Sequence, residues 1–198
     1  SPTPWQTDTC IRGWHYKRGI QYKTPKKVID LLVDIVSKNG NLLLNFPLPN
    51  SGELDFAERE TLGGITAWMA VNSEGIYATR PWKIYGEGPS TKVVIRSNGK
   101  EFDPNESKQP DLTAADIRFT TKGSTIYAFV QGWPEGPAVI PALGTSSAQN
   151  PPKITGATML GDPTQLKFTQ EGGGFKVTFP PSQTPTADIG ITLKLTTA

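Results

Sequence analysis

The sequence predicts an α/β fold over residues 1–82 followed by an all-β fold over residues 83–198. Three observations lead to this fold class. An apolar run of three leucines at 42–44 lies between two segments with helical periodicity, an order typical of a parallel sheet or barrel covered by helices. Beyond Trp82 the apolar pattern changes to that of short strands, and turn signals separate these strands, as in a β-sandwich.

Composition excludes several function classes. Of the 198 residues, 36% are hydrophobic and 19% charged, and the formal net charge is +2, which gives no reason to expect nucleic acid or an anionic membrane as a partner. No apolar run approaches the roughly 20 residues that a membrane span needs. The single cysteine, Cys10, excludes an intrachain disulfide and a cysteine metal cluster. No signal peptide begins at Ser1, so we expect a cytoplasmic protein or a mature or truncated one.

Residues 1–23 show little periodicity, and we expect a loop there that binds something or packs against something outside the chain. Asp8 is its only carboxylate. A general acid would use such a group, but an aspartate that bonds its own backbone in a turn is the commoner outcome and the one we expect. The loop is dense in rings: Trp5, Trp14, His15, Tyr16 and Tyr22.

A first helix is predicted to begin at Thr24-Pro25, with a hydroxyl cap and proline in the first turn, and to end at Asn39-Gly40. Its apolar stripe consists of Val28, Leu31, Leu32, Ile35 and Val36. A second helix is predicted from Asp55, which forms a capping box with Glu58, to about Asn72. We expect its buried face to contain Leu62, Ile65 and Met69.

The strand 41–46 between these helices is too short for a helix and apolar enough to be buried on both faces. One or two β/α units cannot cover both faces or close a sheet. We therefore expect companion strands outside this chain, from a partner chain or, as we favour, from a longer protein. Barrels place their chemistry at the carboxyl ends of such strands, so Asn45 and the loop after it are expected to point toward a site.

Short strands are predicted throughout the second half, with a hairpin turn at Lys122-Gly123-Ser124 and a polar loop over 97–111. Trp133, beside a glycine and a proline, is expected to close one end of the core rather than to bind sugar. The predicted strands are Lys92–Arg96, Asp116–Thr121, Thr125–Gln131, Lys153–Leu160, Gln165–Gln170, Lys176–Pro180 and Ile189–Leu195.

Several stretches resemble the carboxyl-terminal portion of the α-L-fucosidases of glycoside hydrolase family 29. The similarity is strong over residues 4–134 and thin afterwards, and the run Val33–Asn45 is the most family-specific part. The stretches that carry it are Pro4–Cys10, Trp14-His15-Tyr16, Val33–Asn45, Trp68 with Asn72–Tyr77, Thr79–Trp82, Asp116–Thr120, Tyr127 and Gly132-Trp133-Pro134.

The resemblance implies that residues 1–82 are the last β/α units of a (β/α)8-like catalytic barrel and that residues 83–198 are a β-sandwich domain. It implies a retaining exo-glycosidase that hydrolyses terminal α-L-fucosyl linkages, which needs two carboxyl groups and no metal or cofactor. The implied partners are a fucosylated glycan or glycoconjugate and the missing amino-terminal barrel portion, as a separate or cleaved chain. We expect a secreted or periplasmic protein.

No catalytic residue is assigned to this chain. No stretch matches the family's nucleophile strand or its paired histidines, and Gln6 stands where some members carry glutamate after the tryptophan. The residues expected to bind substrate are Trp14, His15 and Asn45, because an aromatic ring can pack on the methyl group and apolar face of fucose. Arg12 could touch a leaving-group sugar, although surface arginines usually do not.

Two alternatives remain open from the sequence. One is a non-catalytic carbohydrate-binding β-sandwich module, and the other is an interaction domain without a ligand. The helix–strand–helix segment argues against both, because a binding sandwich has no use for β/α units.

Overall fold

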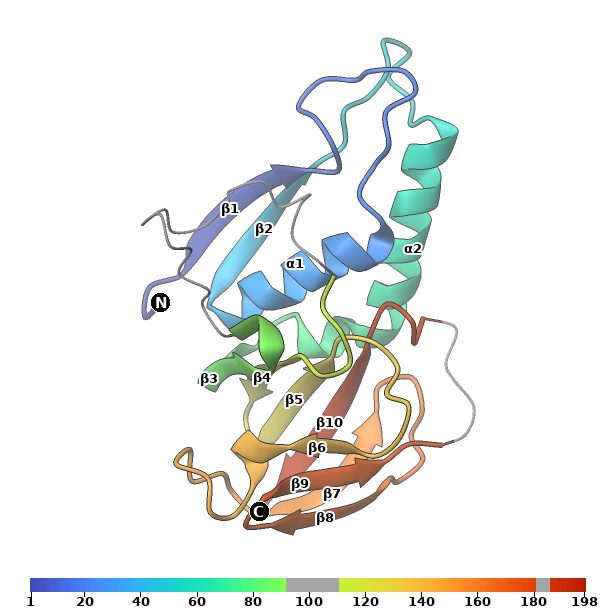
Figure 1. The fold of residues 1–198 in the computed structure, drawn as a ribbon. Helices are drawn as coiled ribbons and strands as arrows, with labels where there is room; N and C mark the ends of the chain where they lie inside the picture. Colours follow the sequence, from blue (N-terminus) through green and yellow to red (C-terminus); the bar gives the residue numbers. More distant parts are fainter. Residues whose placement is uncertain (92–110, 181–185) are drawn as a thin grey trace, which may run out of the picture.

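The computed structural model describes residues 1–91, 111–180 and 186–198. Figure 1 shows two β/α units at one end and two antiparallel sheets at the other. The helices and strands are β1 (Trp5–Cys10), α1 (Pro25–Ser37), β2 (Gly40–Asn45), α2 (Phe56–Asn72), β3 (Arg80–Glu87), β4 (Ile117–Lys122), β5 (Thr125–Val130), β6 (Ala138–Ile140), β7 (Ile154–Met159), β8 (Lys167–Glu171), β9 (Gly174–Thr178) and β10 (Ile191–Thr197). The expected α/β plus all-β fold class is confirmed.

Strand β1 pairs in parallel with β2, in a register that runs from Trp5 opposite Gly40 to Cys10 opposite Asn45. The expectation of a loop over 1–23 was therefore wrong for this segment. Asp8 lies in the middle of β1 and not in a turn. The strand was not predicted because one of its faces carries a tryptophan and threonines and the other carries mostly polar residues, so the two faces differ little in hydrophobicity.

The leucine strand β2 is covered on one face only by the residues that the structure describes. Leu42 and Leu44 are half-buried on the side of Gly40, which lies against Ile35 of α1. Leu43 points the other way and is 56% exposed. Burial on both faces, as the apolar run predicted, is thus not reached within the described residues, where the two-stranded sheet has helices on one side only.

Helix α1 has the predicted ends. The Thr24 hydroxyl accepts from the Lys27 backbone N–H at 3.1 Å, and Asn39, with φ of 70°, ends the helix in the left-handed conformation. Burial extends well beyond the predicted stripe, because α1 lies between the β1–β2 sheet and the sandwich (Figure 1). The buried residues of α1 are Lys27, Val28, Ile29, Asp30, Val33, Ile35 and Ser37.

Helix α2 has the predicted capping box, in which Asp55 and Glu58 each accept from the other's backbone N–H at 2.8 Å. The predicted buried face is confirmed for Ile65 and Met69, which pack against the core, and wrong for Leu62. Leu62 is exposed, whereas Trp68 is fully buried. The Trp68 indole N–H donates to the Gly190 carbonyl at 2.8 Å, and this bond connects α2 to the sandwich. Ile65 and Met69 are half-buried, and the other buried residues of α2 are Glu58, Thr61 and Asn72.

The sandwich consists of a five-stranded sheet, β3-β4-β5-β10-β7, and a three-stranded sheet, β6-β9-β8. The hairpin β4–β5 turns at Gly123, whose φ is 58°, as predicted. Trp133 packs against the core and against Phe179, with ring centroids 5.7 Å apart, in agreement with its predicted structural role. Side chains from both sheets form one core that includes Phe119, Ala128, Ile140, Phe175, Val177, Leu193 and Leu195.

Six of the predicted strands are confirmed with small shifts of their ends, as β4, β5, β7, β8, β9 and β10. Strands β3 and β6 were missed. The predicted strand Lys92–Arg96 and the polar loop, apart from Asp111, lie outside the described residues. Since β3 begins at Arg80, the domain boundary expected after residue 82 falls inside a strand, and that division stays a prediction.

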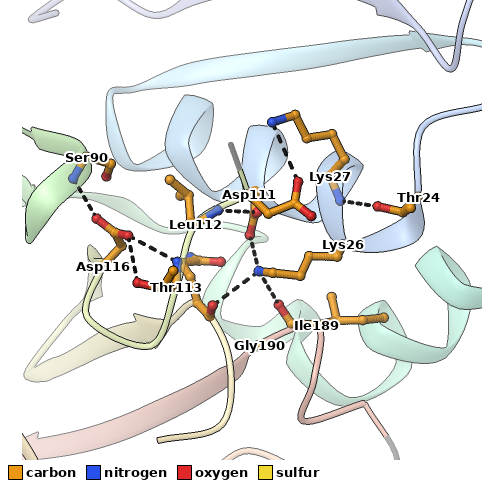
Figure 2. A network of polar contacts seen from close by, with 12 residues as sticks. Thr24, Lys26, Lys27, Ser90, Asp111, Leu112, Thr113, Asp116, Ile189 and Gly190 are labelled. Carbon is orange, nitrogen blue, oxygen red and sulfur yellow. Dashed lines mark hydrogen bonds and ion pairs between the residues drawn. The ribbon is translucent and has the colours of Figure 1, made fainter. Parts of the chain in front are cut away.

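Polar contacts tie α1 to the second half of the chain, as Figure 2 shows for Lys26. The Lys26 ammonium donates to Asp30 at 2.9 Å, to the Gln131 carbonyl at 3.1 Å and to the Ile189 carbonyl at 3.2 Å. Burial raises the pKa of Asp30, and the hydrogen bond from Lys26 acts against that rise. No helix in the described ranges combines the length and apolar character needed to cross a bilayer.

Candidate sugar-binding site

The candidate site lies at the carboxyl ends of β1 and β2. Because the two strands are parallel, their following loops meet at the same edge of the sheet, at the top of Figure 1. A hollow of 670 Å³ opens there between these loops. The structure brings together all three residues expected to bind substrate, since Trp14, His15 and Asn45 all line it. The other lining residues are Tyr16, Phe46, Pro47, Leu48 and Asn50.

Residues 11–23, the aromatic loop, form a closed loop whose two ends meet. The Lys23 backbone N–H donates to the Ile11 carbonyl at 2.7 Å, and the Lys23 ammonium donates to the Cys10 carbonyl at 2.6 Å. Ile11 is fully buried, and its N–H donates to the Asn45 carbonyl at 3.1 Å. The base of the loop is therefore part of the sheet edge, and only its middle projects into solvent.

The N-cap of α2 holds the far side of the aromatic loop. The Tyr22 hydroxyl donates to Asp55 Oδ2 at 3.1 Å, and Tyr16 also donates to this carboxylate. The backbone N–H of Glu58 lowers the pKa of Asp55, and the two phenols lower it further. Burial and the Asp55 carboxylate raise the pKa of Tyr22. Sequence reasoning missed this anchor, because Asp55 was recognised only as a helix cap.

The three predicted residues present different chemistry to the hollow. Trp14 is 55% exposed and offers a free ring face, and His15 is exposed beside it. Asn45 is half-buried, and its Nδ2 atom has no hydrogen-bond partner within the described part of the chain. A buried donor left unsatisfied costs about 1–3 kcal/mol. The Asn45 amide is therefore the group most in need of an acceptor supplied from outside these residues.

The lining supplies rings, amides and one imidazole, but no carboxyl group among its eight residues. Within the described ranges no group of three or more histidine, cysteine, aspartate or glutamate side chains is placed to hold a metal ion. The hollow can pack and hydrogen-bond a polar ring, but its own side chains lack the two carboxyl groups that glycosidic bond cleavage uses.

Comparison with known families gives the context for this arrangement. A family model described as α-L-fucosidase matches residues 1–74, and a second, described as the α-L-fucosidase C-terminal domain, matches residues 109–196. The chain belongs to the α-L-fucosidase family.

Named relatives agree with this placement. The chain is 30% identical to the tissue α-L-fucosidase of Rattus norvegicus over 203 residues and 29% identical to that of Homo sapiens, and each alignment covers 97% of this chain. The same alignments cover only 37% of either relative. This α-L-fucosidase family chain thus spans little more than a third of the length of the curated relatives it matches.

Solved structures match over nearly the whole chain. The α-L-fucosidase isoenzyme 1 of Paenibacillus thiaminolyticus superposes with a TM-score of 0.71 at 25% identity, over 98% of this chain and 40% of that one. The α-fucosidase of Thermotoga maritima gives a TM-score of 0.73 at 24% identity, with the same coverage. The α-L-fucosidase family chain therefore has the fold of the corresponding part of these enzymes.

Proposed function

We propose that the protein containing this chain is a retaining α-L-fucosidase and that this chain forms one wall of its sugar site. The observation that carries the proposal is the meeting of Trp14, His15 and Asn45 around one hollow at the carboxyl edge of β1 and β2, in a chain of this family. The Trp14 ring packs on the methyl group and apolar face of fucose. His15 and the unpartnered Asn45 amide bond to its hydroxyls.

The reacting carboxylates come from outside the lining. Retaining hydrolysis needs a nucleophile and an acid/base group about 5–5.5 Å apart, and no residue that lines the hollow is acidic. The amino-terminal portion that the relatives carry and this chain does not match is their source. Barrel strands from that portion add at the free edges of the β1–β2 sheet, and the exposed face on which Leu43 lies then points into the barrel core.

The substrate proposed is a fucosylated glycan or glycoconjugate. A structure of the Thermotoga maritima enzyme holds fucose, which supports that substrate class. We further propose that the protein is secreted or periplasmic. In support, a relative that is 32% identical over 105 residues is named the plasma α-L-fucosidase of Homo sapiens.

The experiment is a rate measurement on a chromogenic aryl α-L-fucoside. We expect no turnover by residues 1–198 alone and turnover when the amino-terminal portion is joined to them or copurifies with them. Turnover by the chain alone would refute the proposed source of the nucleophile. Tight binding of fucosyl glycans without turnover, even when both portions are present, would favour the carbohydrate-binding module instead.

A substitution tests the wall itself. In the active protein Trp14→Ala is expected to lower kcat/KM about 5- to 20-fold, chiefly through KM, because it removes the ring that packs on the sugar. Tyr77→Ala is the matched control, since Tyr77 is 66% exposed at the opposite end of the strands and does not line the hollow. If the two substitutions lowered kcat/KM equally, Trp14 would not be part of the sugar site.

A further inference from the structure

Positive charge is segregated in the sequence around the aromatic loop. The whole chain has 20 lysines and arginines against 18 aspartates and glutamates. Residues 9–29 contain six of those cations and none of the anions, so the rest of the chain carries a net negative charge. A potential of this kind at the edge of a binding site raises the local concentration of anionic ligands.

Half of the six cations are already engaged. Lys23 donates to the Cys10 carbonyl, Lys26 pairs with Asp30, and Lys27 pairs with Asp111 at 3.6 Å (Figure 2). The other three are Arg12, Lys17 and Arg18. All three are exposed and form no ion pair with any residue in the described ranges.

These three cations flank the aromatic wall of the hollow. Arg12 stands two residues before Trp14, and Lys17 and Arg18 directly follow Tyr16. The loop that carries them is fixed at its base by the Ile11–Lys23 bond. On its far side the phenols of Tyr16 and Tyr22 bind Asp55. The backbone of the loop that carries the three cations is therefore anchored beside the hollow.

The acids of the facing loop have partners other than Arg12, Lys17 and Arg18. Asp55 accepts from Tyr22 and from the Glu58 backbone, and Glu53 pairs with Arg59 at 3.7 Å. The eight residues that line the hollow include no acid. A ligand that enters beside Trp14 thus meets cations and rings, but no carboxylate from this wall.

We propose that the aromatic loop binds an oxyanion, a sulfate ester or a carboxylate, on the sugar unit that leaves when the α-L-fucosyl bond is cleaved. The inference rests on the proposed function and specifies its substrate class. A guanidinium fork bonds two oxyanion oxygens at once, and lysine adds a point charge.

The test compares three fucosyl trisaccharides that differ only in the unit next to fucose: neutral, sulfated and carboxylated. With the active protein at about 20 mM salt we expect kcat/KM for an anionic trisaccharide to exceed that for the neutral one on the order of tenfold. At about 500 mM salt the preference is expected to disappear, because exposed charges are then screened. The sulfate and carboxylate arms distinguish the two sources of the oxyanion.

Charge-matched variants locate the effect. The triple substitution Arg12→Gln, Lys17→Gln, Arg18→Gln is expected to make the three kcat/KM values converge. A control triple substitution, Lys153→Gln, Lys167→Gln, Lys176→Gln, removes the same charge from exposed positions of the sandwich and is expected to keep the preference. A preference absent from the wild type, present at high salt, or retained in the loop variant would overturn the proposal.

The proposal can fail separately from the fucosidase activity. If no fucoside is cleaved, calorimetric titration with the sulfated and the carboxylated trisaccharide still measures whether the aromatic loop binds an oxyanion. Salt-sensitive binding of either one that the loop variant loses and the sandwich variant keeps would support the oxyanion site. Failure of both to bind the wild type under the same conditions would exclude it.

Discussion

Asp55 shows how one side chain serves two structures. One carboxylate oxygen caps α2 through the Glu58 N–H, and the other accepts the Tyr22 hydroxyl of the aromatic loop. Asparagine caps a helix as well as aspartate does, yet it offers only one acceptor oxygen. Asp55→Asn therefore separates the two tasks, because it keeps the cap and removes the anchor of the loop.

We expect Asp55→Asn and Tyr22→Phe each to raise KM for a fucosyl trisaccharide about three- to tenfold, with kcat and melting temperature little changed. The effects are expected to be non-additive in the double variant, since both remove the same bond. Tyr77→Phe is the control. Additive effects, or a loss of stability that matches the loss of activity, would count against an anchoring role.

Glu87 carries a pH-dependent cost to stability. One carboxylate oxygen accepts from the Ala142 N–H at 3.0 Å, and the other is buried without a partner in the described ranges. Burial raises the pKa of Glu87 above its ordinary 4.5, against the effect of the Ala142 bond. The folded state thus holds this proton longer than the unfolded state, so the contribution of Glu87 to the unfolding free energy falls as pH rises above 4.5.

Glu87→Gln is expected to remove that decline, because glutamine keeps an acceptor for Ala142 and carries no charge. Urea unfolding of both proteins between about pH 4 and pH 7 checks the sign. The stability difference between variant and wild type should shift in favour of the variant as pH rises. A difference that does not change with pH would show that Glu87 titrates alike in the folded and unfolded states.

Residue-level reasoning placed Asn45 at the carboxyl end of a strand from the strand direction alone, and it took Trp14 and His15 from the family resemblance. That all three line one hollow depends on β1, which this reasoning had expected to be a loop.

Residue-level reasoning has its clearest limit at long sequence separation. It did not find the bond between Tyr22 and Asp55, which joins residues 33 positions apart. Nothing in either local pattern encodes such a pair. Arg118 was missed for the same reason, because its ion pair with Asp34 spans 84 positions.

At the scale of elements, α1 is the helix that joins the two halves. The buried Arg118 of β4 donates through Nε to Asp34 of α1 at 2.7 Å, and its other nitrogens donate to Ser90 Oγ and the Ile117 carbonyl. The same carboxylate pairs with Lys38 at 2.6 Å on the exposed side. One helix residue therefore faces a buried cation and an exposed cation, which permits an internal comparison.

Asp34→Ala is expected to cost about 3 kcal/mol of unfolding free energy, because it leaves Arg118 buried beside an empty partner site. Lys38→Ala removes the exposed pair and the cation–π contact of Lys38 with the Tyr85 ring, and it is expected to cost about 1 kcal/mol. Urea unfolding of residues 1–198 measures both. Costs of equal size would mean that burial of Arg118 adds nothing to this contact.

Elements were predictable where a cap or a turn marks them. Thr24, Asp55 and Gly123 placed two helices and a hairpin correctly. The missed strands lack such marks: β6 has three residues, and β3 shifts its register against β4 between Pro81 and Gly86. The buried face of α2 was only partly predicted, because the helix turns Trp68 toward the sandwich, a contact that periodicity alone does not reveal.

At the scale of the whole molecule, the exposed face of the β1–β2 sheet is expected to matter little for the stability of residues 1–198 and much for the activity of the longer protein. Leu43→Asp is expected to change the unfolding free energy of residues 1–198 by no more than about 0.5 kcal/mol, because the side chain is 56% exposed. In the protein with its amino-terminal portion, the same change is expected to lower activity at least about tenfold, since it buries an unpaired charge.

Val139→Asp is the matched control, because Val139 is 53% exposed on β6, away from that face. It is expected to leave both stability and activity unchanged. If Leu43→Asp were equally silent in the active protein, the sheet face would remain open to solvent there too. The barrel assignment of residues 1–82 would then be wrong.

The single backbone bond between Ile11 and Lys23 has an evolutionary consequence. Because this bond closes the aromatic loop at its base, the residues between Ile11 and Lys23 can be lengthened, shortened or exchanged with little change in the free energy of folding. If the proposed function holds, homologues with the same strands and helices can differ in the glycan they bind through changes in this one segment, with no change in the catalytic residues.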